Sequence, residues 1–234
     1  METDRFVRQA GLVPRDRLAA LTATIIGLGA IGRPVALQLA AMGVGRLQLV
    51  DFDHVELTNI TTQGYLLTDL GLPKVAALAR LITQIDPQVG VDLVPDRYRP
   101  QHPTSDVVFC CVDRIETRAA IWRSQQARAQ FWADARMRGE VGRILTATDD
   151  ISREHYGTTL FPQSDAQVGT CTAKGTIYTA SIAAGLILHQ FARWRRGQSC
   201  DADASFDLVA SDFVVQPVRS QQKSSSLQHA VVRP

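Results

Sequence analysis

The sequence has few cysteines, and no two of them are spaced as metal ligands. The 234 residues include four cysteines, and no C-x-x-C pair occurs among them. A four-thiolate zinc site therefore has no ligands in this chain, and we expect no zinc. In a reducing compartment the four would remain free thiols. They are Cys110, Cys111, Cys171 and Cys200.

The sequence also lacks a long apolar run. Its longest nearly apolar stretch, residues 178–188, is shorter than the roughly 20 residues that a transmembrane helix needs. The first five residues are charged and polar, and no apolar signal core follows them. These two features predict a cytoplasmic protein without a membrane partner.

A large excess of charge of either sign is absent too. The 25 lysines and arginines nearly balance the 23 acidic residues, which leaves a net charge of +2. This small charge gives no reason to expect nucleic acid as a partner. The hydrophobic content of 45% and the charged content of 21% are those of an ordinary globular protein. The length suits one domain with short appendages.

What is present is a glycine-rich loop between a strand pattern and a helix pattern. Residues 21–26 are apolar like a strand, and residues 31–42 have the spacing of a helix, with Gly27, Gly29 and Gly32 between them. The first two glycines let the backbone turn and approach a phosphate, and Gly32 lets the helix pack close to the strand. The helix start then offers free N–H groups and its positive dipole end to an anion.

A second strand and an acidic residue complete the pattern. Residues 46–50 form this strand, and Asp51 follows it, 19 positions after Gly32. A carboxylate at this distance is typical of one that accepts hydrogen bonds from a ribose. The strand, loop, helix, strand and acid together predict a nucleotide-binding site.

Strands and helices continue to alternate along the chain. This pattern predicts an α/β, Rossmann-like, doubly wound and mostly parallel sheet, with antiparallel strands at its C-terminal side. We expect strands at 91–94 and 107–112, helices at 72–85 and 115–130, a strand pair at 131–136 and 142–148, and closing strands within 206–215.

The pattern divides the chain into one domain and a tail. Residues 1–215 form the predicted domain, which starts with a helical arm at 1–20 anchored by Phe6, Leu12 and Leu18. Residues 149–170 are polar and predict a mobile crossover loop. Residues 172–195 are apolar nearly all round, which predicts a buried helix. Residues 216–234 are polar and contain no acid, which is typical of a disordered tail.

Three charged residues bear on which nucleotide is bound. Asp113 follows the fourth predicted strand, which in a doubly wound sheet lies beside the first, so its carboxylate is placed to hold Mg²⁺ on phosphates. Lys74 stands in the first turn of a helix, where a cation opposes the helix dipole unless a polyphosphate is bound. Together with Arg8 they favour displacement at phosphorus over hydride transfer. Each also has a plain structural interpretation: a solvated Arg8, a surface Lys74, and Asp113 as a helix N-cap.

With these residues in view, the chain resembles the ThiF/MoeB/ubiquitin-activating superfamily, and most of all its stand-alone bacterial adenylyltransferases. The resemblance covers residues 5 to about 130 and rests on several motifs in order. These are Arg5-Phe6-Val7-Arg8-Gln9, Gly27-Leu28-Gly29-Ala30-Ile31-Gly32, Asp51-Phe52-Asp53, Val55-Glu56-Leu57-Thr58-Asn59, Gly71-Leu72-Pro73-Lys74, and Val112-Asp113 with Arg118.

The resemblance implies ATP-dependent adenylation of the C-terminal glycine of a ubiquitin-like or sulfur-carrier protein that ends in Gly-Gly. It implies Asp51 on the ribose, Asn59 and Lys74 on the phosphates, and Mg²⁺ on Asp113. It also implies a homodimer in which Arg8 acts on the nucleotide of the other subunit. The implied ATP-binding residues are Gly27, Gly29, Ala30, Gly32, Asp51, Asp53, Asn59, Gln63, Lys74 and Arg114.

The chain departs from the family in two ways. The family commonly has an arginine three residues after the asparagine, and here that position is Thr62. Arg114 is a candidate for supplying the missing phosphate contact. The zinc cysteines of many members are absent, which weakens the thiamine and molybdopterin interpretation.

Cys171 is the candidate nucleophile. It precedes the predicted helix at 172–195, with Lys174 one turn on, and both features lower the pKa of a thiol. The resemblance implies a thioester or acyl disulfide at this position in some members, and a buried structural cysteine is the alternative. Cys110 and Cys111 are interpreted as core residues. We assign no role to Cys200, His155 or His189, none of which has an evident partner in the sequence.

The sequence therefore predicts an enzyme that activates a ubiquitin-like protein and passes it through Cys171 to a conjugating enzyme. Activation of a sulfur carrier is the alternative within the superfamily. A nicotinamide-dependent oxidoreductase and a non-catalytic dimeric scaffold are the alternatives of other classes.

Overall fold

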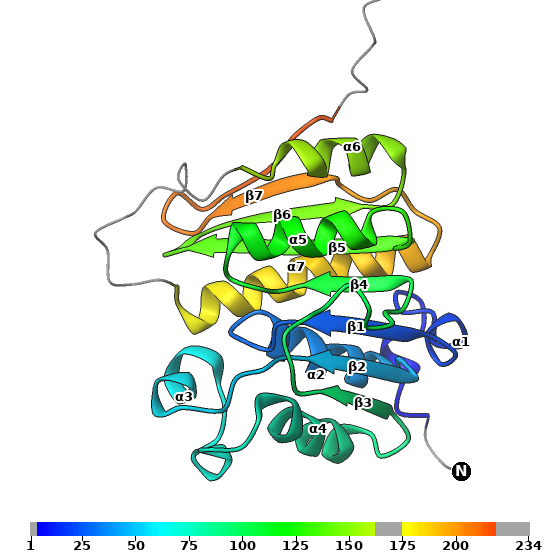
Figure 1. Cartoon of the computed structure of the whole chain (residues 1–234). Helices are drawn as coiled ribbons and strands as arrows, with labels where there is room; N and C mark the ends of the chain where they lie inside the picture. The colour runs from blue at the N-terminus through cyan, green and yellow to red at the C-terminus, as the bar shows by residue number, and fades with distance from the viewer. Residues whose placement is uncertain (1–3, 162–174, 219–234) are drawn as a thin grey trace, which may run out of the picture.

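The computed structural model describes residues 4–161 and 175–218. Within these residues one eight-stranded sheet has the order β3-β2-β1-β4-β5-β6-β7-β8 (Figure 1). The strands β1 to β5 are parallel, and β6, β7 and β8 continue the sheet in antiparallel pairs. This confirms the predicted fold class. The strands are β1 (Thr22–Ile26), β2 (Arg46–Val50), β3 (Gly90–Val94), β4 (Val107–Cys110), β5 (Phe131–Arg138), β6 (Val141–Ala147), β7 (Asp203–Asp207) and β8 (Asp212–Val215).

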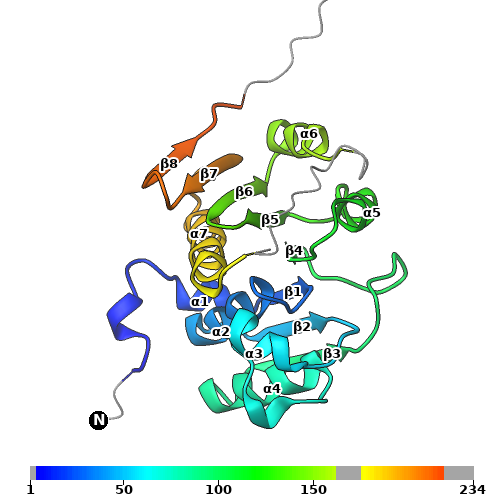
Figure 2. The same ribbon diagram turned by 90° about the vertical axis from the view of Figure 1, so that its left-hand side faces the viewer.

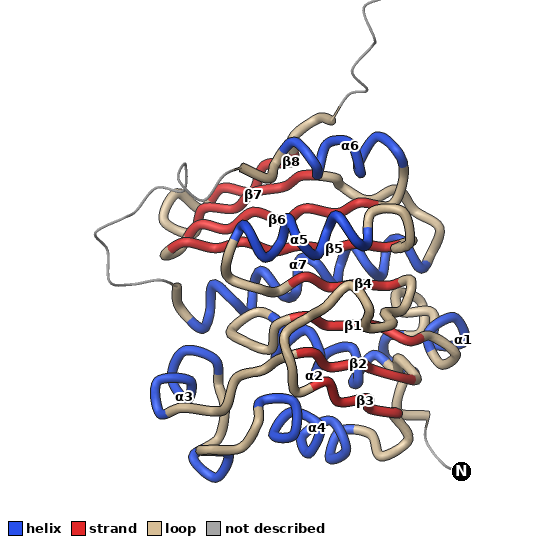
Figure 3. The backbone as a smooth tube through the Cα atoms, viewed as in Figure 1, coloured by secondary structure: helices blue, strands red, loops and turns tan. Residues whose placement is uncertain are grey.

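Helices cover both faces of the sheet, as Figures 2 and 3 show. On one face α2, α4 and α7 pack together, and α5 and α6 lie on the other. The helices are η1 (Val7–Gln9), α1 (Arg15–Leu18), α2 (Gly32–Met42), α3 (Leu57–Gln63), η2 (Leu67–Asp69), α4 (Lys74–Ile85), α5 (Ile115–Gln125), α6 (Asp150–Thr158) and α7 (Ile177–Arg195).

The central strands β1 and β4 are buried on both faces, because side chains of alternating direction enter two cores. Ile25 and Phe109 belong to the larger core under α2, α4 and α7. Ile26, Val108 and Cys110 belong to the smaller core under α5 and α6. A strand buried on both faces therefore has a continuous apolar sequence, and β4 shows this pattern, whereas β1 interrupts it with Thr22 and Thr24.

The predicted strand pair after α5 is a hairpin. β5 and β6 pair from Trp132 and Ala147 to Arg138 and Val141, with Gly139 at the turn. The backbone of Gly139 has a φ of +60°, a left-handed conformation that glycine adopts without strain.

The expected loop at 149–170 is wrong for its first part. Asp149 caps α6: its carboxylate accepts a hydrogen bond from the Ser152 amide at 2.8 Å. Tyr156 anchors the helix in the smaller core. Hydrophobic spacing missed α6 because Tyr156 is its one buried large apolar side chain and Ile151 is exposed, whereas its capping box was visible in the sequence. Residues 162–170 lie outside the described residues.

Two expectations about the ends of the domain need correction. Phe6 and Leu18 are buried anchors of the N-terminal arm, as predicted, but Leu12 is 67% exposed. The helix α7 is not buried all round, because Tyr178 and Ile182 are exposed on the side away from the sheet. In the part of the chain that the structure describes, no helix combines the length and apolar character needed to cross a membrane.

Candidate functional site

The glycine-rich loop lies where the strand order reverses, with β2 on one side of β1 and β4 on the other. The Gly27 amide donates to the carbonyl of Val50, and the Cys111 amide donates to that of Ile26, so the loop is tied to both neighbours. In parallel α/β sheets, the carboxyl ends of the strands at such a reversal bind ligands. The predicted nucleotide site therefore has the expected position in the sheet.

Each glycine of the loop has its own structural reason. Gly27 has a φ of +90°, and a Cβ there would lie 2.8 Å from the carbonyl oxygen of Cys111. A Cβ on Gly32 would lie 1.8 Å from the carbonyl oxygen of Gly27. A Cβ on Gly29 would meet nothing closer than the Gln63 amide at 4.0 Å, among the described residues. Gly29 therefore leaves space above the loop, where a ligand could approach the backbone.

Asp51 holds the loop in place. One of its carboxylate oxygens accepts a hydrogen bond from the Leu28 amide at 2.6 Å, and the other accepts one from the Asp53 amide at 2.8 Å. Burial raises the pKa of Asp51, and the two amide bonds and Lys74 only partly offset this effect. The side chain expected on the ribose is thus already engaged by backbone in this structure.

Asp53 and Lys74 form an ion pair at the same edge of the sheet. The Nζ of Lys74 lies 3.0 Å from Oδ2 of Asp53, and the Lys74 amide donates to the Asp53 carbonyl. The lysine side chain is 6% exposed, whereas that of Asp53 is 46% exposed. Since charged side chains are almost never fully buried unless paired, Asp53 fixes a buried ammonium beside the loop while its own carboxylate stays open to solvent.

The helix α3, which the sequence patterns did not predict, brings Gln63 to the loop and carries Asn59 in its first turn. Asn59 is buried, and its side-chain oxygen accepts a hydrogen bond from the Glu56 amide in a capping box. Beyond the helix, the Tyr65 hydroxyl donates to the carbonyl of Leu28 at 2.8 Å. Tyr65 is a loop-positioning residue that sequence reasoning missed, and no motif would have revealed it.

Asp113 lies just past β4, with an exposed side chain. Arg118 fixes its main chain by donating from Nη1 to the Asp113 carbonyl at 2.9 Å. Arg118 also binds the buried carboxylate of Asp134 at 2.8 Å. Burial alone would raise the pKa of Asp134, but Arg118 and Arg136 hold it below the usual value. This buried network was not recognised in the sequence, because its members come from separate strands and helices.

Arg8 is not near the loop within its own chain. Next to it, Gln9 donates to the carbonyl of Ala41 at the C-terminal end of α2, and Arg5 pairs with Asp86 at the end of α4. The glycine-rich loop lies at the other end of α2, which at about 1.5 Å per residue is some 16 Å away. The structure thus brings Lys74, Asp53 and Gln63 to the loop but leaves Arg8 remote from it.

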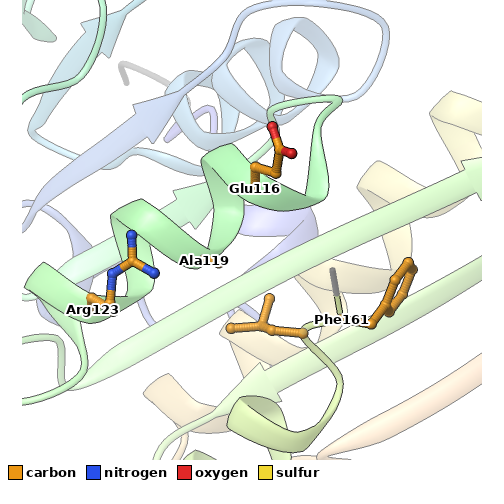
Figure 4. A pocket seen from close by; sticks show the side chains of 5 residues that line it. Glu116, Ala119, Arg123 and Phe161 are labelled. Atoms are coloured by element: carbon orange, nitrogen blue, oxygen red, sulfur yellow. The ribbon is translucent and has the colours of Figure 1, made fainter. Parts of the chain in front are cut away.

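An open hollow of about 520 Å³ lies beside α5 (Figure 4). Glu116 and Arg123 project from α5 on one side, and Phe161 lies on the other. Glu116 also pairs with Arg114 at 2.9 Å, so the hollow begins within one turn of Asp113. Its lining is Glu116, Ala119, Arg123, Leu160 and Phe161.

Comparison with known proteins identifies the family. The model described as ThiF family matches residues 3–225. The chain belongs to the ThiF family.

Curated relatives of this ThiF chain carry several activities. The sulfur carrier protein ThiS adenylyltransferase of Escherichia coli is 30% identical over 159 residues, 65% of this chain and 63% of that protein. The molybdopterin-synthase adenylyltransferase of Haemophilus influenzae is 34% identical over 111 residues, 44% of this chain and 45% of that protein. Ubiquitin-like modifier-activating enzyme 5 of Caenorhabditis elegans is 29% identical over 136 residues, 51% of this chain and 32% of that protein. The chain spans less than two thirds of the length of these relatives.

Solved structures share the ThiF fold of this chain. The crystal structure of PaaA is 21% identical with a TM-score of 0.74, covering 93% of this chain and 73% of that one. E. coli MccB with MccA is 17% identical with a TM-score of 0.74, covering 93% and 72%. At these identities the likeness concerns the fold.

The position that departs from the ThiF pattern is occupied by a neutral side chain. Thr62 is exposed on α3, and its hydroxyl donates to the Thr58 carbonyl at 2.7 Å. Arg114, the candidate replacement, is 63% exposed and already paired with Glu116. Thr62 therefore offers no charge to a phosphate, and Arg114 would first have to leave its partner.

The described residues of this ThiF chain contain no cluster of three or more histidine, cysteine and acidic side chains that could hold a metal. A single exposed carboxylate such as Asp113 nevertheless fits magnesium bound to a nucleotide, because Mg²⁺ usually takes one or two carboxylates, phosphates and waters. The carboxylate near the loop therefore suits a Mg²⁺ ion that is also bound to the phosphates of ATP.

The described cysteines are poor nucleophiles. Burial raises the pKa of Cys110 to about 12 and that of Cys200 to about 11, and it also raises the pKa of Cys111. Cys110 belongs to the smaller core and Cys111 packs against the larger one, as expected of structural residues. Cys171 and Lys174 lie outside the described residues, so the nucleophile prediction stays a prediction.

His155 has a partner that the sequence did not reveal. Its Nε2 lies 2.7 Å from Oδ2 of Asp203, which Arg143 also binds at 2.6 Å. The partners come from α6, β6 and β7, which explains why a lone histidine in the sequence showed no constellation.

Proposed function

We propose that this ThiF-family protein is an adenylyltransferase that uses ATP to activate the C-terminal glycine of a ubiquitin-like protein. The observation that carries the proposal is the meeting, at the carboxyl edge of the parallel strands, of an open glycine loop, a buried ammonium and an exposed carboxylate. Lys74 and Asp113 would converge on the phosphates there. A hydride-transfer site has no need of these charges.

In the proposed reaction, a carboxylate oxygen of the terminal glycine attacks the α-phosphorus of ATP. A new carbon–oxygen–phosphorus link forms, and the bond from the α-phosphorus to the bridging oxygen breaks. Pyrophosphate leaves with that electron pair. Lys74 stabilises the charge on the departing phosphates. Asp113 would hold Mg²⁺, which when bound neutralises part of the phosphate charge.

We assign the two aspartates after β2 different roles. Asp51 positions the loop, since both of its oxygens accept amide hydrogen bonds. Asp53 is the more accessible acceptor for the ribose, because nearly half of its side chain is exposed. Asn59, Gln63 and the loop backbone at Gly29 complete the proposed ATP site, with Ala30 beginning the turn into α2.

We propose that the protein works as a homodimer and that Arg8 reaches the nucleotide of the partner subunit. The remote position of Arg8 within its own chain supports action in trans. Exposed apolar side chains on α7 and on β8 are candidates for contact with a second copy, since large exposed apolar patches often mark an interface. Tyr178 is 49% exposed and Phe213 51%.

After adenylation, Cys171 would accept the acyl group as a thioester, release AMP, and pass the acyl group to a conjugating enzyme. We expect Cys171→Ala to leave pyrophosphate exchange intact and to prevent the thiol-sensitive adduct with the carrier. A normal adduct in this variant would refute the transfer step alone.

Activation of a sulfur carrier is the second candidate, and the names of the sulfur-carrier and molybdopterin-synthase relatives favour it. The test of both is pyrophosphate–ATP exchange with a small protein ending in Gly-Gly, and with the same protein lacking that dipeptide. Exchange only with the intact carrier supports activation, and a thiocarboxylate product then identifies the sulfur-carrier case. No exchange with any carrier would favour a non-catalytic scaffold. Reduction of a nicotinamide cofactor would favour an oxidoreductase.

A further inference from the structure

Arg33 is a half-buried cation beside the glycine-rich loop. It is the second residue of α2, directly after Gly32, and its amide donates to the Gly29 carbonyl at 3.1 Å. Its Nε is shielded from solvent and makes no hydrogen bond, and its side chain forms no ion pair among the described residues. Burial lowers the pKa of Arg33, while Tyr65 and Asp69 oppose this effect.

The neighbours of Arg33 place it against the proposed phosphate site. Its guanidinium carbon lies 5.2 Å over the ring of Tyr65, the residue whose hydroxyl holds the Leu28 carbonyl of the loop. Its Nη1 lies 3.0 Å from where a Cβ on Gly64 would stand. Gln63, the residue before Gly64, faces the open space over Gly29. The side-chain oxygen of Gln63 is also buried without a hydrogen bond.

The electrostatics of this position are unfavourable without an anion. The first turn of a helix carries a partial positive charge, which a cation opposes. Asp69, the nearby carboxylate, accepts a hydrogen bond from the Leu66 amide and faces Arg80 at 3.7 Å. An anion bound at the start of α2 would satisfy both the guanidinium and the helix dipole.

We propose that Arg33 binds the phosphates of ATP beyond the α-phosphate, in place of the arginine that the ThiF pattern puts at the position of Thr62. This inference rests on the proposed function, since it assumes ATP in the loop. Arg114 is the less suitable replacement because it is exposed and paired with Glu116. Arginine suits the role because its planar fork donates two parallel hydrogen bonds to phosphate.

The test is the affinity for ATP and for AMP, each with magnesium, measured by calorimetry on the full chain. For Arg33→Gln we expect ATP to bind about ten- to a hundredfold more weakly, the usual value of one charge-assisted contact. AMP affinity should change by less than about threefold, because AMP lacks the phosphates concerned. Arg33→Lys keeps the charge but loses the planar fork, so its ATP affinity should fall between those of the wild type and Arg33→Gln. Thr62→Arg added to Arg33→Gln should restore part of the loss.

The controls separate this inference from the proposed function. Arg46→Gln removes an exposed arginine that pairs with Asp92 at the opposite edge of the sheet, and it should leave both affinities unchanged. An Arg33→Gln variant that binds ATP like the wild type, or loses ATP and AMP affinity equally, overturns the role of Arg33. The role of Arg33 is also overturned if Arg114→Gln, and not Arg33→Gln, selectively weakens the binding of ATP relative to AMP. Wild-type protein that binds no ATP overturns the proposed function itself. If Arg33→Gln does not fold, Thr62→Arg in the wild-type background decides. An arginine at that position should tighten ATP binding by less than about threefold where Arg33 already contacts the same phosphates, and a gain of tenfold or more would overturn the role of Arg33.

Discussion

The two halves of the sheet treat buried charge in opposite ways. In the parallel half, burial raises the pKa of Asp51 and lowers that of Arg33, so both charged forms are disfavoured. In the antiparallel half, which here means the antiparallel pairs from β5 to β8, cationic partners hold the pKa of Asp134 and of Asp203 below the usual value despite burial. In the second half, protein side chains already compensate the charges of Asp134 and Asp203. In the first half, a bound ligand of suitable charge would compensate the charges that burial disfavours.

Compensated charges contribute to the stability of the fold, whereas uncompensated charges are available to bind a ligand. Asp134 is bound by Arg118, Arg136 and Tyr156, so all of its charge is compensated within the protein. Near the glycine loop, Asp113 is instead exposed, and Arg33 forms no ion pair with any residue in the described ranges. Perturbed or unsatisfied groups of this kind gather at functional sites, where preorganisation for a ligand costs stability of the free protein.

The largest expected effect on activity comes from Asp113→Ala. We expect pyrophosphate exchange to fall by at least about a hundredfold, the usual size of losing one electrostatic contact to a reacting phosphate. The midpoint of thermal unfolding should stay within about 2 °C of the wild type, because the side chain is exposed. Unchanged exchange would show that Asp113 does not hold the metal. A large loss of stability would show that its side chain stabilises the fold instead.

Asp134→Ala, in contrast to Asp113→Ala, should strongly lower the free energy of unfolding. Removing one partner of a buried ion pair costs about 3–5 kcal/mol, since Arg118 and Arg136 would be left uncompensated. The free energy of unfolding in urea measures the loss, with Asp96→Ala, which removes an exposed carboxylate paired with Arg99, as the matched control. A loss below about 1 kcal/mol would show that the network is not what stabilises the antiparallel half.

The position of Arg8 predicts complementation between two inactive variants. Arg8→Ala and Asp113→Ala should each be deficient in exchange, whereas a mixed dimer contains one site with both residues intact. Random mixing makes half of the dimers mixed, with one good site of two, so about a quarter of wild-type activity should return. Mixtures no more active than the separate variants would argue against action in trans.

The contrast between the halves also explains what the sequence could and could not predict. The β1–α2–β2 unit was readable because Gly27, Gly29, Gly32 and Asp51 form a local motif with a fixed spacing. Arg33 lies inside that motif and was still missed, because its lack of an ion pair among the described residues is a property of α3 and Tyr65 packed beside it. Asp134 and Asp203 were invisible for the same reason, since their partners lie on other strands and helices.

Helix α6 teaches a related lesson about periodicity. Its residues are mostly polar, so hydrophobic spacing gave no signal, yet Asp149 and Ser152 form a capping box that does appear in the sequence. Burial of Tyr156 against Trp122 and Trp132 then supplies the tertiary contact that fixes the helix. Local capping rules are therefore the better guide where a helix buries a single large side chain.

The smallest expected effect concerns Asp203 and the dependence of stability on pH. Its carboxylate is faced by Arg143 on β6 and His155 on α6. Burial alone would raise the pKa of Asp203, but these partners lower it. A depressed pKa stabilises the fold above the unfolded value of about 3.9 and loses that contribution as pH falls through the folded value. Asp203→Asn should therefore be less stable than wild type at pH 7, with the difference shrinking below about pH 4. Unfolding midpoints from pH 7 to pH 2 measure this. A constant difference across that range would mean that Asp203 acts through its shape and hydrogen bonds rather than its charge, and the contrast between the two halves would then rest on Asp134 alone.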